Sequence, residues 1–255
     1  MKVSMHCSRI PRIALLLLLA VAALTPARAA DQSLPGDRQA LDQAIHDYLM
    51  NHPEVIVESL RAAEKKMQDA QDAEARVAIG DKQGELLRDP SSPVGGNPEG
   101  DVTIVEFFDY HCPYCKQVEP ALDTLIKEDP KIRIVYKEFP ILGADSVTAS
   151  QAALAALKQG PQKYTRFHAA MMSVKGSIGE SVVMQVAKDA GLDLARLKTD
   201  MKTPEIEAAI KRNYDLADAL KIRGTPAFIV GDALAPGAVD LDTLRKMVAD
   251  ARKRG

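Results

Sequence analysis

Two cysteines three positions apart are the residues of this sequence best suited to chemistry. Cys112 and Cys115 enclose Pro113 and Tyr114 and follow an apolar run that ends at Phe108. A Cys-x-x-Cys pair that follows a strand and opens a helix has its first sulfur at the helix N-terminus, where free backbone N–H groups favour a thiolate. We therefore expect Cys112 to have a lowered pKa and to attack disulfides, and Cys115 to resolve the mixed disulfide that forms.

Neighbouring side chains are expected to tune this pair. Pro113 and Tyr114 lie between the sulfurs and add no negative charge that would oppose the thiolate. His111 precedes the first cysteine; a protonated His111 would favour the thiolate, and the alternative is an exposed loop histidine. Glu106 is a carboxylate within an apolar strand, where its charge is costly unless it is paired or neutralised. We interpret Glu106 as a buried proton acceptor for Cys115, with a structural ion pair as the alternative.

Two other uses of the cysteine pair have less support. A structural disulfide that closes so short a loop would remove little entropy from the unfolded chain. Half of a metal site would need further ligands, but no second Cys-x-x-Cys follows, and His46, His52 and His168 lack zinc-ligand spacing to the pair. His168 has helical spacing to Tyr164 and Met172, and we assign it to the core. We expect neither a metal nor an organic cofactor.

The first 29 residues have the pattern of a secretory signal peptide. Basic side chains precede an apolar run from Ile13 to Leu24, and Ala27-Arg28-Ala29 supplies a small-residue cleavage pattern. The apolar run is shorter than the roughly 20 residues that cross a bilayer. We expect cleavage after Ala29, loss of Cys7 with the leader, and a periplasmic location.

Charge excludes two classes of partner. Cleavage would remove four basic side chains and no acidic one, which leaves 29 basic and 35 acidic residues and a formal net charge of −6. The charges of both signs are interspersed along the chain. Neither nucleic acid nor an anionic membrane surface is therefore an expected partner.

The spacing of apolar residues predicts two N-terminal helices. Leu41, Ile45 and Leu49 share one helical face, and Asn51-His52-Pro53 interrupts the pattern. A second helix is predicted from there to about Arg88. Its apolar residues recur at heptad-like spacing, at Ile56, Leu60, Ala63, Met67, Ala70 and Val77. This thin stripe suits a partner helix, so residues 38–88 are interpreted as a homo-oligomerisation arm; the alternative is packing against their own domain.

The remainder of the chain predicts an α/β domain. A stretch rich in Pro, Gly and Ser from Asp89 to Gly100 is typical of a linker, and we divide the chain into a helical segment at 30–90 and a domain at 91–255. Strand, helix and strand patterns follow between Val102 and Glu138. A helical block at about 146–220 then precedes a last strand and a terminal helix. This order predicts a sheet protein with a helical insertion between its halves.

Two motifs resemble one known family. The segment from Val105 to Cys115 resembles the active-site segment of DsbA-type thiol-disulfide oxidoreductases, and Gly224-Thr225-Pro226-Ala227-Phe228 resembles their second motif. The resemblance implies a thioredoxin-like fold with a helical insertion. It also implies that Pro226 follows a cis peptide bond and faces the redox pair, that Thr225 contacts the client backbone, and that a buried acid stands at Glu106.

The N-terminal helices depart from the monomeric DsbA pattern. They are similar to the suppressor-of-copper-sensitivity C and Com1-like proteins, some of which oligomerise through this segment and isomerise disulfides. The resemblance implies cysteine-containing client proteins, a membrane redox partner and disulfide isomerase activity. A monomeric dithiol oxidase or reductase is one alternative. A copper-binding or copper-tolerance protein, which holds Cu(I) with the reduced cysteines, is an alternative of another class.

Overall fold

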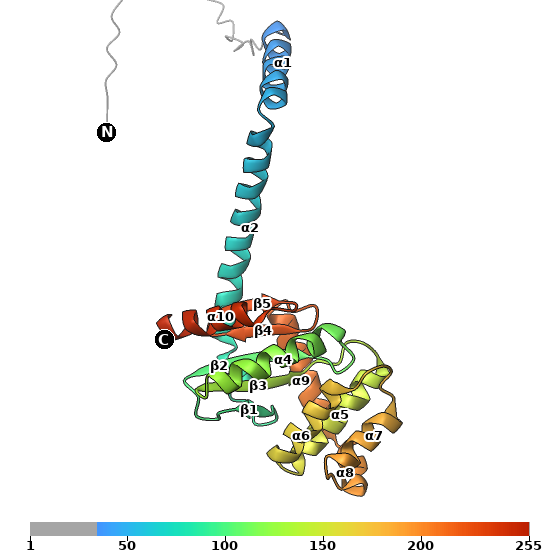
Figure 1. The fold of residues 1–255 in the computed structure, drawn as a ribbon. Coiled ribbons are helices and arrows are strands. Elements are labelled where there is room, and N and C mark those ends of the chain that lie inside the picture. The colour runs from blue at the N-terminus through green and yellow to red at the C-terminus, as the bar shows by residue number, and fades with distance from the viewer. Residues whose placement is uncertain (1–34, 255) are drawn as a thin grey trace, which may run out of the picture. The chain divides into compact units, whose positions relative to one another are not determined.

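The computed structural model describes residues 35–254 of the chain (Figure 1). The expected signal peptide lies outside these residues. The described chain forms two compact units that divide after Ser59. Within residues 35–254, no helix has the length and apolar character needed to cross a bilayer.

The N-terminal helices are α1 (Pro35–Asn51) and α2 (Pro53–Asp81). As predicted, the first helix ends before Pro53, which has no backbone N–H and is therefore suited to the first turn of the next helix. The second helix is shorter than predicted. It ends at Asp81, and a separate helix α3 (Gln83–Leu87) follows. Gly80 and Gly84 flank the break, and glycine is a poor helix former.

The second unit is built on a five-stranded mixed sheet with the strand order β1-β3-β2-β4-β5. Strands β2 and β3 are parallel, and each other neighbouring pair is antiparallel. Helices α5 to α9 lie between β3 and β4 in the chain, so the predicted fold with its helical insertion is confirmed. The elements are β1 (Val94–Gly96), β2 (Val102–Phe108), α4 (Pro113–Glu128), β3 (Ile132–Glu138), α5 (Ala144–Lys158), α6 (Pro161–Ser173), α7 (Glu180–Asp189), α8 (Leu194–Asp200), α9 (Pro204–Ala219), β4 (Ala227–Val230), β5 (Ala233–Pro236) and α10 (Leu241–Arg254).

Strands β2 and β4 are buried on both faces of the sheet, since nearly all their residues are buried and successive side chains point to opposite sides. On one face, Ile104 and Phe108 pack with residues of α4, α10 and the helical insertion. On the other face, Val105 and Phe107 pack in a second cluster with residues of α2, α3 and α9. The end of the N-terminal helical segment therefore contributes to the core of the second unit.

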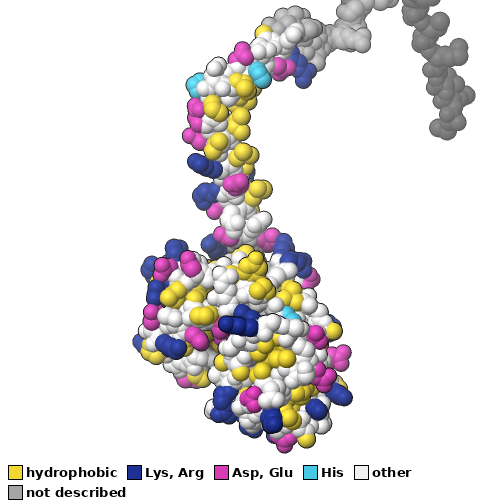
Figure 2. Space-filling model, turned by 45° about the vertical axis from the view of Figure 1, so that its right-hand side comes forward, with side chains coloured by type: hydrophobic (Ala, Val, Ile, Leu, Met, Phe, Trp, Pro, Cys, Tyr) yellow, Lys and Arg dark blue, Asp and Glu magenta, His cyan; other side chains and the backbone are white. Residues whose placement is uncertain are grey.

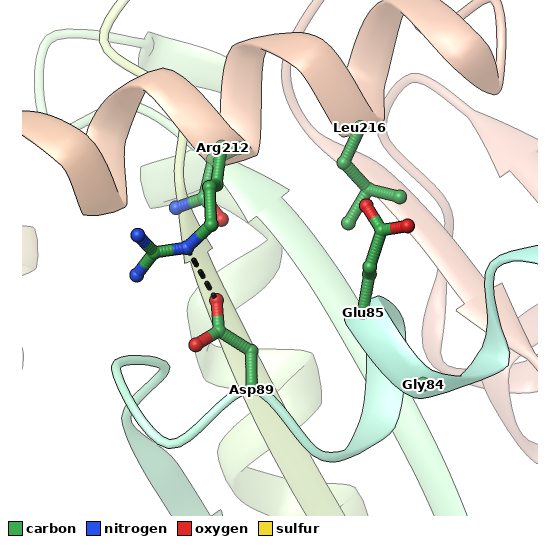
Figure 3. A pocket seen from close by; sticks show the side chains of 6 residues that line it. Gly84, Glu85, Asp89, Arg212 and Leu216 are labelled. Carbon is green, nitrogen blue, oxygen red and sulfur yellow. Dashed lines mark ion pairs between the residues drawn. The ribbon is translucent and has the colours of Figure 1, made fainter.

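A buried lysine holds the connection between α3 and β1. Lys137 is fully buried, and its Nζ donates hydrogen bonds of 2.7 Å to the Glu85 carbonyl oxygen and of 2.7 Å to Ser92 Oγ. Burial lowers the pKa of Lys137 to about 8. Arg212 of α9 forms an ion pair of 3.6 Å with Asp89 beside a cavity of about 230 Å³ (Figure 3). These contacts fasten much of the Pro- and Gly-rich stretch to the sheet and to α9.

Candidate active site

The two cysteines lie where the sheet meets helix α4. Cys112 is the N-cap residue with an extended backbone (φ −75°, ψ 116°), and Pro113 begins the helix. The predicted strand-to-helix setting is thus confirmed. Both sulfurs are reduced. Cys112 is 4% exposed and Cys115 is 0% exposed, whereas Tyr114 between them is 61% exposed.

The environment of Cys112 favours its thiolate. A hydrogen bond from the Cys115 thiol is the largest cause that lowers the pKa of Cys112, to about 5. Hydrogen bonds from the Thr225 side chain and from the backbone N–H groups of Tyr114 and Cys115 also lower this pKa, whereas burial raises it. The same contacts place a negative charge at the N-terminus of α4, which the helix dipole stabilises. Cys112 is therefore ionised at neutral pH.

This lowered pKa predicts the pH dependence of Cys112 reactivity. The thiolate is present above the folded-state pKa and is lost as the pH falls through it, so alkylation of the reduced protein by iodoacetamide should be half-maximal near pH 5. Mass spectrometry of the alkylated peptide identifies the cysteine that reacts. A midpoint above about pH 8, where an unperturbed thiol ionises, would contradict the assignment.

Cys115 has the opposite character. Its hydrogen bond to the Cys112 sulfur is the largest cause that raises the pKa of Cys115, and burial and the charge of Glu106 raise it further. Cys115 is therefore a thiol at neutral pH while Cys112 is reduced. It needs a proton acceptor before it can attack.

Glu106 is the buried acid of the strand that leads to the cysteines. It is 1% exposed, and burial, followed by the charges of Glu119, Glu138 and Cys112, raises its pKa well above the ordinary value. Its Oε2 atom has no hydrogen-bond partner among the described residues. No ion pair found in residues 35–254 includes Glu106. The geometry therefore gives no support to the alternative of a structural ion pair.

The loop before β4 meets the redox pair. The Thr225–Pro226 peptide bond is cis, as the family resemblance implied. Strand β4 pairs with β2, and this pairing brings the Thr225 carbonyl oxygen to 3.2 Å from Cys112 Sγ. The two motifs that are more than a hundred residues apart in the sequence thus form one site.

Asp109 shapes the turn before Cys112, and sequence reasoning missed it. It is fully buried, and its carboxylate accepts hydrogen bonds from the backbone N–H of His111 (2.8 Å) and of Leu142 (3.0 Å). An Asp side chain that accepts a hydrogen bond from the backbone two residues later is common in turns. The sequence signal for this role was therefore an Asp directly after the predicted strand.

His111 contacts the helical insertion. Its side chain is 21% exposed, and its Nε2 donates to the Ile178 carbonyl oxygen at 2.9 Å. His111 therefore links the turn to the helical insertion.

A polar cluster is buried behind the turn. Glu138 accepts hydrogen bonds from Ser150 (2.7 Å), Tyr110 (3.3 Å) and Tyr164 (3.4 Å), and burial raises its pKa to about 8. His168 is 3% exposed, which confirms its assignment to the core. It is hydrogen-bonded through Nδ1 to the Tyr110 hydroxyl at 3.0 Å. Since Tyr110 belongs to the turn, this cluster supports the loop that carries Cys112.

The described residues contain no group of three or more His, Cys, Asp and Glu side chains arranged to hold a metal ion. The chemistry that the geometry can perform rests on the two sulfurs and the acid beside them. A stabilised thiolate, a neighbouring protonated thiol and a buried carboxyl group are the groups needed to make and break a mixed disulfide.

Comparisons with known proteins agree with this geometry. The sequence profile of the DsbA-like thioredoxin domain matches residues 103–249, and that of the copper resistance protein ScsC N-terminal domain matches residues 37–70. A curated relative, the Na(+)/H(+) antiporter NhaA 3 of Salinispora tropica, is 29% identical over 184 residues. The match covers 69% of this chain and only 28% of the antiporter's length.

Two solved structures are similar over most of their length. A thioredoxin-like oxidoreductase from Silicibacter pomeroyi is 48% identical with a TM-score of 0.65, and the match covers 67% of this chain and 97% of that one. A linker-deletion mutant of Proteus mirabilis ScsC is 26% identical with a TM-score of 0.68, and the match covers 90% and 100% of the two chains. The cysteine pair, the cis-proline loop and these matches together show that the chain belongs to the DsbA-like family of thiol-disulfide oxidoreductases and has the N-terminal segment of ScsC proteins.

Proposed function

We propose that this protein exchanges disulfides with folding proteins in the periplasm through Cys112 and Cys115, and that it acts as a disulfide isomerase. The observation that carries the proposal is the position of Cys112. Its sulfur lies at the start of α4 and 3.2 Å from the carbonyl oxygen of Thr225, with a pKa lowered to about 5. Such a sulfur attacks disulfides and is also a good leaving group.

In the first step, the Cys112 thiolate attacks one sulfur of a client disulfide. A bond forms between Cys112 and that sulfur, the client's S–S bond breaks, and the other client sulfur leaves as a thiolate. The client stays attached by a mixed disulfide. An isomerase then lets the freed client thiolate attack another disulfide of the same client, which releases a different client thiolate. That thiolate attacks the client sulfur bonded to Cys112, so a new client S–S bond forms and Cys112 leaves as a thiolate without net oxidation or reduction.

The second step releases a client that does not rearrange. Cys115 gives its proton to Glu106 and attacks Cys112 Sγ, so the mixed disulfide breaks and the client leaves as a thiolate. The client sulfur pair has then gained two electrons, and Cys112 and Cys115 have formed a disulfide. A membrane redox partner would be needed to return this pair to the dithiol form.

A Cys115→Ser variant tests the assignment of the two cysteines. Attack by Cys112 should continue, because the serine hydroxyl is also a hydrogen-bond donor and can take the place of the Cys115 thiol beside the Cys112 sulfur. Release by Cys115 should stop, so the mixed disulfide with a scrambled client protein accumulates and reductive turnover falls to background. Non-reducing gel electrophoresis and an insulin-reduction assay measure the two effects. Unchanged turnover would overturn the proposed mechanism.

The isomerase assignment is supported by the N-terminal helices. Helix α2 carries large apolar side chains in water: Leu60 is 58% exposed, Met67 is 60% exposed and Val77 is 66% exposed. Hydrophobic side chains are visible along this helix in Figure 2. An apolar stripe at heptad-like spacing is typical of helices that pair with each other. Several active sites in one oligomer can act together on one misfolded client.

A doubly substituted helix tests the role of the stripe. The variant Leu60→Glu with Met67→Glu should convert an oligomer to a monomer in light scattering, because a buried unpaired carboxylate opposes helix association. The matched control is Ala62→Glu with Ala73→Glu, which adds the same charge at exposed positions of the same helix outside the stripe. If the unaltered protein is itself a monomer, oxidase or reductase activity replaces isomerase activity as the proposal.

A further inference from the structure

A cleft adjoins the cis-proline loop on the side of helix α2. Its volume is about 600 Å³, and every residue that lines it belongs to the unit that begins at Leu60. One wall is the α2 face formed by Gln68, Gln71, Asp72 and Ala75. The floor and the other wall come from the loop between α9 and β4 and from the end of β5. The cleft shares Thr225 and Pro226 with the redox site and extends from them to α2.

The floor of the cleft has free backbone groups. Arg223, Gly224 and Thr225 belong to no helix or strand, and Arg223 and Gly224 are exposed. None of their N–H groups donates a hydrogen bond to the described residues. An exposed segment with unpaired backbone donors is suited to bind another extended chain, which supplies the missing acceptors.

The cleft is continuous with the reacting sulfur. Thr225 lines the cleft, and its carbonyl oxygen is 3.2 Å from Cys112 Sγ. A client cysteine that is joined to Cys112 must therefore lie beside Thr225. Since an extended chain advances about 3.3 Å for each residue, the next few client residues on that side reach the wall formed by α2.

Most charges around the cleft are paired within the protein, and Asp72 accepts a hydrogen bond from the Gln68 amide. Lys221 forms an ion pair with Glu74 of α2, and Arg223 forms one with Asp218. Lys221 has a left-handed backbone (φ 57°) after α9, at a place where glycine is the usual residue. Its long side chain instead links the loop to α2. The walls therefore present amide groups and small apolar groups to a client. They carry no net charge, so the cleft is not expected to prefer a cationic or an anionic segment.

We propose that residues 68–75 of α2 form the second wall of the client-binding site, and that the cleft holds an extended client segment next to the cysteine bonded to Cys112. The inference rests on the proposed disulfide exchange and adds the partner's conformation to it. It predicts that α2 contributes to reactions with polypeptides. Small disulfides carry too few residues beyond the sulfur to reach α2.

A tryptophan scan of α2 tests the second wall. Ala75→Trp fills the cleft, and the matched control Ala73→Trp puts the same side chain on an exposed position of α2 that does not line it. Stopped-flow kinetics measure how fast each full-length protein reacts with two oxidants. One is glutathione disulfide, and the other is a mixed disulfide between glutathione and the cysteine of an extended peptide. For Ala75→Trp we expect the peptide rate to fall about tenfold while the glutathione rate stays within twofold. Ala73→Trp should leave both rates unchanged.

The outcomes separate this inference from the proposed function. If the unaltered protein reacts with neither oxidant, disulfide exchange itself is wrong. If it reacts with both and Ala75→Trp changes neither rate, or slows both equally, the second wall is wrong and disulfide exchange stands. Hydrogen exchange provides a second measurement without a substitution in α2. The protein for this measurement is Cys115→Ser joined to the peptide by a mixed disulfide. Hydrogen exchange reports on the backbone of residues 223–225, and hydroxyl-radical labelling reports on the solvent accessibility of residues 68–75. Slower exchange at 223–225 with unchanged accessibility of 68–75 would also overturn the inference.

Discussion

Replacing Glu106 with glutamine is expected to slow the release of a client from its mixed disulfide by about 100-fold, the lower end of the usual contribution of a proton acceptor. Cys115 has a raised pKa, to which the charge of Glu106 contributes. Its attack therefore requires that the proton leave as the new S–S bond forms. Glutamine fills nearly the same space in the buried strand and cannot accept that proton.

The measurement must separate the two steps of exchange. Quenched-flow samples resolved on non-reducing gels give the rate of mixed-disulfide formation and the rate of its decay. Formation should change little, because hydrogen bonds from Cys115, Thr225 and the helix N-terminus hold the Cys112 thiolate. Glu128→Gln, at an exposed carboxylate in the last turn of α4, is the matched control. An unchanged decay rate in Glu106→Gln would remove Glu106 from the mechanism.

Replacing Leu86 with alanine is expected to lower the free energy of unfolding by about 3 kcal/mol, as for other buried leucines. Leu86 of α3 is 1% exposed and packs with Val105 and Phe107 on one face of the sheet. The substitution leaves a cavity at a position that the sheet cannot readily fill. Because Leu86 precedes the Pro- and Gly-rich stretch, this loss would show that the N-terminal segment helps to stabilise the domain.

Urea unfolding followed by circular dichroism measures the change. The control is Leu60→Ala on α2, where the side chain is 58% exposed and the expected change is within about 0.5 kcal/mol for one chain by itself. Both proteins should be measured at low concentration so that association does not add to the stability of the control. Equal, small losses in the two variants would mean that α3 does not contribute to the cooperative core.

The chemistry of the site could be predicted from local sequence, because its main residues are close together in the chain. Cys112 and Cys115 follow a recognisable strand and open a helix, and Glu106 is a charged residue in an apolar run. The part played by Thr225 and Pro226 needed a family resemblance, since a Thr-Pro pair before a strand is by itself only a turn.

The buried polar contacts could not be predicted in this way. Lys137 and Glu138 are adjacent at the end of β3, and nothing in the sequence indicates that both are buried. Their partners come from distant segments: Lys137 bonds Ser92, and Glu138 bonds Tyr110 and Ser150. Such partners meet only after the sheet and the helical insertion have packed. The break between α2 and α3 was missed for a similar reason, because an apolar pattern continues through it while the chain turns onto the sheet.

The lowered pKa of Cys112 also has a consequence for electron transfer. The contacts that hold its thiolate exist only in the dithiol form, since a disulfide has no charge for the hydrogen bonds and the helix dipole to stabilise. Folding therefore favours the reduced state over the oxidised one, which raises the reduction potential of the pair. An electron donor that keeps the pair reduced therefore works with the thermodynamic preference of the fold, and a weakly reducing donor suffices.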